Sequence, residues 1–291
     1  HKSLASKYKG NGGGKNSGLK IDLVHELKAG ATMKLSMTPG NVSDCHFGSL
    51  MLEELRINDL ILRDLGYFKL DDMRNIDNCG AYFVSRFKYK VKIYLNRDDS
   101  DPIDVGRYLA KRCRDFSTQI IDIAIFLGDT KQRVRLIAYK VSPEVANERR
   151  RKAQYVSRDK GRRPISQGQL NLCDYVILVT NIPTGKIPAE VIGTIYRIRW
   201  TIELIFKTWK SQLKLQINLR GYKPTRIECL VYAILITCLL STLVYGWLKK
   251  INGPEEREIS FDKLTKWLLN KQGYYRLFWS CLLYTSDAAD E

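Results

Sequence analysis

The segment YRIRWTIELIFKTWK, residues 196–210, constrains the fold of this chain more than any other. Its apolar residues recur at helical spacing, which predicts one amphipathic α-helix with a face that packs against a core. At about 100° per residue, its polar residues fall within a stripe of about 80°. They are Tyr196, Arg199, Glu203, Lys207 and Lys210. The apolar residues expected on the opposite side are Ile198, Ile202, Ile205, Trp209 and Leu213.

This polar stripe has two interpretations. The first is an ordinary surface helix, in which Glu203 forms ion pairs with Arg199 and Lys207 that contribute only tenths of a kcal/mol. The second is a metal-binding carboxylate, which needs a second carboxylate elsewhere in the chain. Asp64 is the best candidate, because it follows the apolar run LILR, and strand ends in α/β enzymes collect catalytic side chains. Such carboxylate oxygens prefer Mg²⁺ or Mn²⁺.

The charge of the chain favours a polyanionic partner. Its 48 lysine and arginine residues outnumber 31 acidic residues, which gives a formal net charge of +17. Nucleic acid is the first candidate, and an anionic membrane surface or a merely basic soluble protein remain alternatives. Residues 147–163, NERRRKAQYVSRDKGRR, carry eight cations and two acids. They are either a solvated charged helix or an arm that contacts phosphates through Arg149, Arg150, Arg151, Arg162 and Arg163.

Composition narrows the class of protein. A chain of 291 residues with 44% hydrophobic residues reads as globular. The seven cysteines include no C-x-x-C pair, which favours free thiols in a reducing cytoplasm. The loop KGNGGGKNSG differs from a phosphate-binding loop in spacing and in its final residue. The uncharged run of residues 229–248 has the length of a transmembrane helix, but a buried helix of a large domain would look the same.

The remaining patterns predict an alternation of strands and helices. A hairpin is expected over residues 19–40, a helix near 42–55, a strand that stops at Asp64 and a short helix over 71–78. Apolar β-like runs alternate with polar turns from about 90 to 175, and CDYVILVTNIP is a buried strand. Another amphipathic segment covers residues 261–270.

The spacing Tyr196-x2-Arg199-x3-Glu203-x6-Lys210 resembles the Y-R-E-K signature of DDE transposases from bacterial insertion sequences. The segment RDLGYF around Asp64 is similar to the part of those enzymes that carries their second catalytic aspartate. AYFVSRFK and LVTNIP also look familial, and the resemblance covers about residues 1–250. It implies an α/β fold, an RNase H-like mixed sheet flanked by helices and interrupted by a mostly β insertion.

The resemblance also implies a domain organisation. Asp64 and Glu203 are 139 positions apart, which leaves room for the insertion between them. We expect the first part of the catalytic core in residues 1–90 and the β-rich insertion with its basic arm in 91–175. The second part of the core, with the signature helix, is expected in 176–225, and a helical region in 226–280. Residues 281–291, which end in LLYTSDAADE, are expected to be a non-native tail.

By the same resemblance, Asp64 and Glu203 are the catalytic carboxylates and bind two Mg²⁺ or Mn²⁺ ions. Tyr196, Arg199 and Lys210 would contact DNA, and the helix face adds Lys207 to them. The implied partners are double-stranded DNA at transposon ends and target DNA. A homodimer that pairs two ends, a cytoplasmic, nucleoid-associated location and no membrane contact are also implied, so the uncharged run is expected to be a buried helix.

One departure from the family is serious. The first aspartate of the family lies on a core strand upstream of the glycine-rich loop, and this chain starts at His1, just after that strand. Asp22 lies in the wrong strand to replace it, and Asp44 resembles a helix cap. We therefore expect a fragment that lacks one metal ligand and is inactive by itself. A metal-dependent nuclease of the same fold and a non-catalytic DNA-binding remnant remain alternatives.

Overall fold

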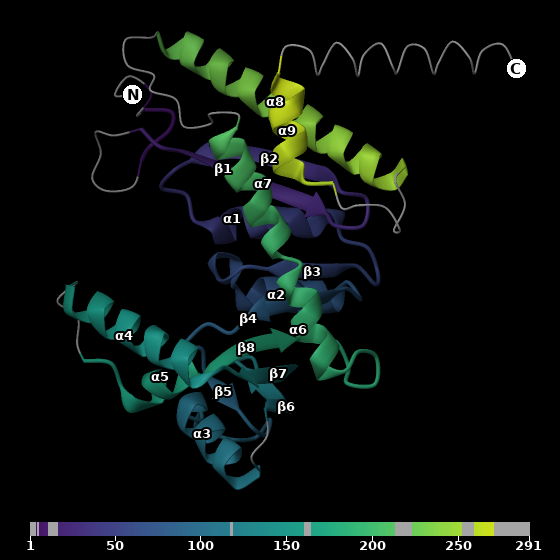
Figure 1. The fold of residues 1–291 in the computed structure, drawn as a ribbon. Helices are drawn as coiled ribbons and strands as arrows, with labels where there is room; N and C mark the ends of the chain where they lie inside the picture. Colours follow the sequence, from purple (N-terminus) through teal and green to yellow (C-terminus); the bar gives the residue numbers. More distant parts are fainter. Residues whose placement is uncertain are drawn as a thin grey trace, which may run out of the picture. The chain divides into compact units, whose positions relative to one another are not determined.

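The structure, a computed structural model, describes residues 4, 6–10, 17–116, 119–159, 164–212, 223–251 and 259–270. The chain divides into two compact units (Figure 1). Unit 1 comprises residues 1–42 and 200–291, and unit 2 comprises residues 43–199. Each unit has a hydrophobic core of its own and is described by itself.

Unit 2 is built on a six-stranded sheet with the order β3-β4-β8-β7-β6-β5. In that order the strands are Leu60–Arg63, Tyr82–Arg86, Tyr175–Thr180, Gln132–Lys140, Ile120–Leu127 and Ile93–Tyr94. β3 runs parallel to β4, and the remaining neighbours are antiparallel. The sheet is therefore mixed, and the prediction of an α/β fold with a mixed sheet flanked by helices is confirmed.

Successive residues of the central strands point to opposite faces of this sheet, so each face has its own core. Phe83, Leu136 and Val179 lie in one core, together with residues of α2 and α3. Their sequence neighbours Val84, Ile137 and Leu178 lie in the other core, with residues of α6. The helices of unit 2 are α1 (Asp44–Leu50), α2 (Leu70–Asn78), α3 (Val105–Phe116), α4 (Pro143–Asp159), α5 (Gln167–Asn171) and α6 (Ala189–Arg197). Short 3₁₀ turns cover Met51–Glu54, Leu65–Tyr67 and Leu172–Asp174.

The predicted strands and the short helix after Asp64 are present, but the segment 91–175 holds more than strands. It supplies β5, β6 and β7 to the same sheet as β3, β4 and β8, and it also contains α3, α4 and α5. α3 was not predicted from the sequence. The domain boundaries proposed above stay predictions.

In its described residues, unit 1 combines a β-hairpin with three helices. β1 (Leu19–Glu26) and β2 (Ala31–Pro39) pair antiparallel, as the sequence predicted. The helices are α7 (Trp200–Ser211), α8 (Pro224–Ile251) and α9 (Phe261–Leu269). Leu23, Ile205, Trp209 and Cys238 form the centre of the core. The turn of the hairpin lies close to α8, since a Cβ atom on Gly246 would be 2.7 Å from the carbonyl oxygen of Gly30.

The prediction that α8 is a buried helix is right for one face only. Leu235, Cys238, Ser241 and Thr242 are buried. The large apolar residues on its exposed face are Tyr232, Ile236, Leu240, Leu243, Trp247 and Ile251. In the described part of the chain, the segment Thr225–Ile251 is also long and apolar enough to cross a membrane, by length and composition alone.

Candidate active site

Asp64 lies at the point where β3 ends. The strand finishes at Arg63, and Asp64 has extended backbone angles before the 3₁₀ turn of Leu65–Tyr67 begins. Because side chains alternate along a strand, Arg63 and Asp64 point in different directions. The side chain of Arg63 is 5% exposed, whereas that of Asp64 is 51% exposed. The strand end therefore presents one carboxylate to solvent, directly beside a buried cation.

The buried cation is held by a dense polar network. The Arg63 guanidinium donates to Asp72 Oδ2 at 3.0 Å and to the carbonyl oxygen of Gly48 at 2.7 Å. Asp72, on α2, is 1% exposed and also accepts a hydrogen bond from the Ser49 hydroxyl at 2.8 Å. An ion pair in so little solvent is stabilising only when hydrogen bonds satisfy both groups, as they do here. The network ties the end of β3 to α1 and α2.

Tyr196, the first residue of the Y-R-E-K spacing, reaches the same strand end from α6. Its hydroxyl donates to the carbonyl oxygen of Arg63 at 3.1 Å, and the residue is 8% exposed. Burial raises the pKa of Tyr196 above its ordinary value, so the hydroxyl keeps the proton that it donates. Tyr196 thus fixes the backbone immediately before Asp64.

Arg199, the second residue of the spacing, lies next to Asp64 itself. Its Nη1 atom is 3.8 Å from Asp64 Oδ1, and its guanidinium carbon is 5.7 Å from the centre of the Tyr196 ring. The contact is a long ion pair with a half-exposed carboxylate, so it contributes little to stability. Its importance is positional, because Tyr196 and Arg199 both meet the two-residue segment Arg63–Asp64.

The prediction of one continuous helix from Tyr196 to Lys210 is wrong. α6 ends at Arg197 and α7 begins at Trp200. Between them, the amides of Ile198 and Arg199 donate to carbonyls three residues back, the pattern of a 3₁₀ turn. Ile198, expected on the buried face, is 46% exposed. β-branched and aromatic residues around the turn have weak helix propensities. A change from α-helical to 3₁₀ hydrogen bonding is therefore less costly here.

Within α7 the predicted separation of faces is confirmed for the described residues; Leu213, also expected on the apolar face, lies outside them. Ile205 and Trp209 are buried in the core of unit 1, whereas Lys207 and Lys210 are exposed. A shallow hollow on this helix is lined by Glu203, Phe206, Lys207, Lys210 and Ser211. Glu203 and Lys210, the carboxylate and the lysine of the spacing, therefore lie together on α7 with Lys207. Asp64, Tyr196 and Arg199 belong to unit 2.

The basic segment forms α4, and its arginines do not share one environment. Arg149 donates to the carbonyl oxygen of Tyr175 at 3.0 Å, and Arg150 forms an ion pair with Asp174. Both arginines attach α4 to the start of β8. Arg151 is exposed. The remaining predicted contacts, Arg162 and Arg163, lie outside the described residues.

The family of the chain follows from comparison with known proteins. Residues 1–240 match the model of the transposase DDE domain. The chain belongs to the DDE transposase family. It is 34% identical, over 89% of its length, to the transposase for insertion sequence element IS231B of Bacillus thuringiensis subsp. berliner. It is 30% identical, over 89% of its length, to the transposase for IS1151 of Clostridium perfringens.

The chain covers only part of the length of these two relatives. The chain spans 57% of the length of the IS231B transposase and 58% of that of the IS1151 transposase. A shorter match, 35% identical over 36% of the chain, is to the transposase InsL for IS186A of Escherichia coli K12. The activity of the longer proteins is therefore only proposed for this chain.

Asp64 and Glu203 have the donor chemistry that a divalent ion requires in this family. Each offers the hard carboxylate oxygens that Mg²⁺ and Mn²⁺ prefer. The described residues contain no group of three or more His, Cys, Asp or Glu side chains placed to hold a metal ion. Asp22, considered above as a replacement ligand, is 2% exposed within β1 and accepts a hydrogen bond from Thr38. Its position is that of a structural carboxylate.

Three residues of unit 2 were missed by sequence reasoning. Arg63 and Asp72 were not singled out, because nothing local shows that residues nine positions apart will form a buried pair. Tyr155 was quoted only as part of the basic segment, and it is 69% exposed on α4. Helical spacing could have found it, since it lies one turn from Arg151.

Proposed function

We propose that this chain is part of a cut-and-paste DNA transposase that cleaves phosphodiesters at transposon ends and transfers the freed strand to target DNA. The observation that carries the proposal is the meeting of Tyr196 and Arg199 with the strand end that bears Asp64. Two residues of the Y-R-E-K spacing thereby contact the segment that sequence reasoning selected independently. The basic charge of the chain supports a DNA partner.

Asp64 and Glu203 would hold Mg²⁺ or Mn²⁺, with two ions expected. A bound divalent ion supplies activation of a water or a 3′-hydroxyl and stabilises the leaving oxygen. Tyr196 holds the Arg63 carbonyl through a hydrogen bond. This bond fixes the backbone at the end of β3, and therefore the position from which the Asp64 side chain extends. Its direct contact with DNA, implied by the resemblance, would be limited to the small exposed part of its ring.

The cations on α7 are proposed to bind the DNA backbone. Lys207 and Lys210 line the same hollow as Glu203, so a phosphate beside them would be near the proposed metal-binding carboxylate. Arg199 would neutralise Asp64 and contribute a further contact to DNA. Because such contacts release counterions from DNA, binding should weaken steeply as salt rises. A homodimer that pairs two ends, in the cytoplasm close to the nucleoid, completes the proposal.

Glu203→Gln in the full-length protein tests the assignment. The change keeps the shape of the side chain and removes its charge, so cleavage should be lost while DNA binding persists. Glu190→Gln is the matched control, since Glu190 is an exposed acid on α6 that the proposal does not use. A normal cleavage rate with Glu203→Gln would overturn the metal role.

A strand-transfer assay with labelled transposon ends separates transposition from simple hydrolysis. A transposase joins the cut end to a second DNA, whereas a nuclease of the same fold only cuts. Binding without any cleavage by the full-length protein would identify a DNA-binding remnant instead.

A further inference from the structure

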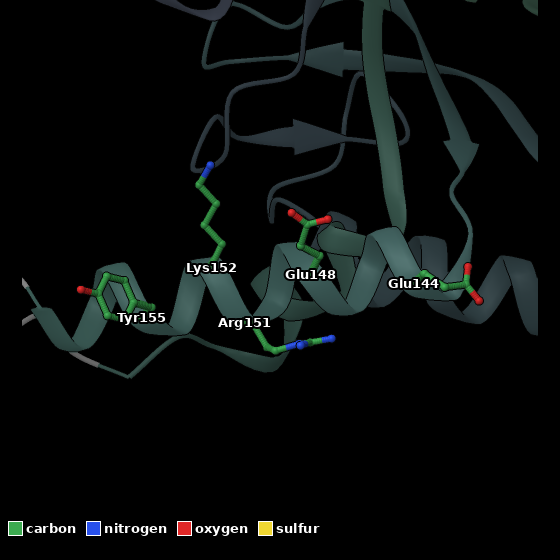
Figure 2. A pocket seen from close by; sticks show the side chains of 5 residues that line it. All are labelled: Glu144, Glu148, Arg151, Lys152 and Tyr155. Carbon is green, nitrogen blue, oxygen red and sulfur yellow. The ribbon is translucent and has the colours of Figure 1, made fainter.

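The outward surface of α4 carries a cluster that neither the fold nor the proposed active site uses. We call it the α4 outer face. It consists of Arg151, Lys152, Tyr155 and Arg158, all of them exposed. Figure 2 shows three of these side chains, those of Arg151, Lys152 and Tyr155, extending from the helix together with Glu144 and Glu148.

The α4 outer face is distinct from the side of the helix that holds α4 in place. Ala146 is buried, Arg149 bonds the carbonyl oxygen of Tyr175, and Arg150 pairs with Asp174. These contacts consume two of the arginines of the basic segment. In the described part of the segment, which ends at Asp159, the cations that remain for a ligand are therefore Arg151, Lys152 and Arg158.

Charge is divided along the exposed side of α4. Glu144 and Glu148 lie toward the N-terminal end of the helix, and Tyr155 lies toward its C-terminal end (Figure 2). This arrangement complements the helix dipole, so it would occur in an ordinary surface helix too. For a polyanion, however, it has a direct consequence. Glu144 and Glu148 disfavour phosphates along the first half of α4, whereas in the half that contains Tyr155 three cations outnumber one exposed acid, Asp159.

Tyr155 indicates which form of nucleic acid fits there. It is 69% exposed, and in the described residues it makes no hydrogen bond or ring contact. Arg151 and Lys152 precede it by four and three positions, and Arg158 follows it by three, so cations flank the ring on the helix surface. A duplex offers phosphates on its outside, for which cations suffice. A single strand offers base faces as well, on which an aromatic ring stacks.

We propose that the α4 outer face binds single-stranded DNA, with Tyr155 stacked on an unpaired base and its three cations on the neighbouring phosphates. The inference rests on the proposed function for DNA as the partner, and adds a preference for unpaired strands at a set of residues that does not include Asp64 or Glu203. Stacking on a base face is tolerant of sequence, so the preference should not depend on which base is present.

The test uses the 291-residue chain and two fluorescein-labelled DNA probes, a single strand of about 12 nucleotides and the duplex of the same sequence. Fluorescence anisotropy gives the dissociation constant of each at several salt concentrations. Tyr155→Ala should weaken binding of the single strand by about tenfold, and of the duplex by less than about twofold. Tyr155→Phe, which keeps the ring, should behave like the unaltered chain.

Arg151→Gln and Arg150→Gln form a matched pair of charge changes at adjacent positions. Arg151→Gln should lower the salt dependence of binding and leave the melting temperature unchanged. Arg150→Gln should lower the melting temperature, because it removes the ion pair with Asp174, and leave the salt dependence unchanged. Equal effects of both changes on the salt dependence would overturn the division of α4 into two sides.

The outcomes separate the inference from the proposed function. If the unaltered chain binds neither probe, the proposal of a DNA partner fails. If it binds the duplex but Tyr155→Ala changes neither affinity, or changes both equally, the stacking role alone is overturned.

Discussion

The buried pair of Arg63 and Asp72 yields the sharpest stability prediction. Asp72→Ala removes a carboxylate that is 1% exposed and leaves the Arg63 guanidinium, 5% exposed, without its counter-charge. The carbonyl oxygen of Gly48 still accepts from Arg63, but a carbonyl carries no net charge. Breaking a buried pair on one side costs about 3–5 kcal/mol. We expect a loss of that size in the free energy of unfolding of unit 2.

Removing both partners should cost much less. Replacing a buried ion pair by apolar side chains of similar volume is often neutral or stabilising, because the desolvation penalty of both charges disappears. The double change Arg63→Met with Asp72→Leu is therefore expected to recover most of the loss. Asp71→Ala is the control. Asp71 is 70% exposed and lies 3.7 Å from Arg74, so its removal should cost less than about 0.5 kcal/mol.

The assay can follow the two units separately. All five tryptophans of the chain lie at position 200 or beyond, so their fluorescence reports on unit 1. Urea unfolding followed by far-UV circular dichroism reports on both units, and hydrogen exchange of the β3 amides reports on unit 2 alone. A loss for Asp72→Ala no larger than for Asp71→Ala, or a double variant as unstable as the single one, would refute the reasoning.

Three further predictions concern unit 1. Burial lowers the pKa of His25, so the unfolded chain takes up a proton at a higher pH than the folded one. The free energy of unfolding from tryptophan fluorescence should therefore fall as the pH drops through about 6.5, and His25→Gln should flatten this dependence; a fall of equal size in the variant would contradict it. Burial raises the pKa of Cys238 to about 12. A thiol-alkylating reagent should therefore modify exposed Cys79 within minutes and Cys238 only on unfolding. Peptide mass spectrometry can follow the modification of both thiols. Gly246→Ala places a methyl group 2.7 Å from the Gly30 carbonyl oxygen. The change should destabilise unit 1 by about 1–3 kcal/mol in urea unfolding. An unchanged urea midpoint would show that the hairpin turn can shift away from α8 without cost.

Local patterns predicted much of the fold, because the elements involved are set by short-range rules. The hairpin of β1 and β2, the strand that stops at Asp64 and buried β8 each follow from an apolar run bounded by turn residues. α3 was missed because Val105 and Leu109 are its only residues in the buried core cluster, its sequence also carries four basic residues, and β-like runs flank it. The order of the strands depends on pairing between distant segments, which periodicity does not report.

Charge density indicated either a solvated charged helix or a phosphate-contacting arm over residues 147–163, but not which partner each cation has. Arg149, Arg150 and Arg151 are adjacent in sequence and chemically identical. The first two have partners near position 175, more than twenty residues away, and the third has an exposed side chain. A local pattern cannot distinguish an arginine that anchors a helix from one that faces solvent. The distinction becomes visible only when β8 is placed beside α4.

The Y-R-E-K spacing shows why a constant helical angle was the wrong basis for the candidate site. The angle calculation placed Tyr196, Arg199, Glu203 and Lys210 on one face of one helix. Tyr196 instead lies in α6, Arg199 in the 3₁₀ turn that follows it, and the other two in α7. What joins Tyr196 to Arg199 is the strand end that both contact, at Arg63 and at Asp64. What joins Glu203 to Lys210 is the exposed face of α7. The spacing therefore encodes two local arrangements in series, so substitutions at Tyr196 and at Lys210 test different physical functions.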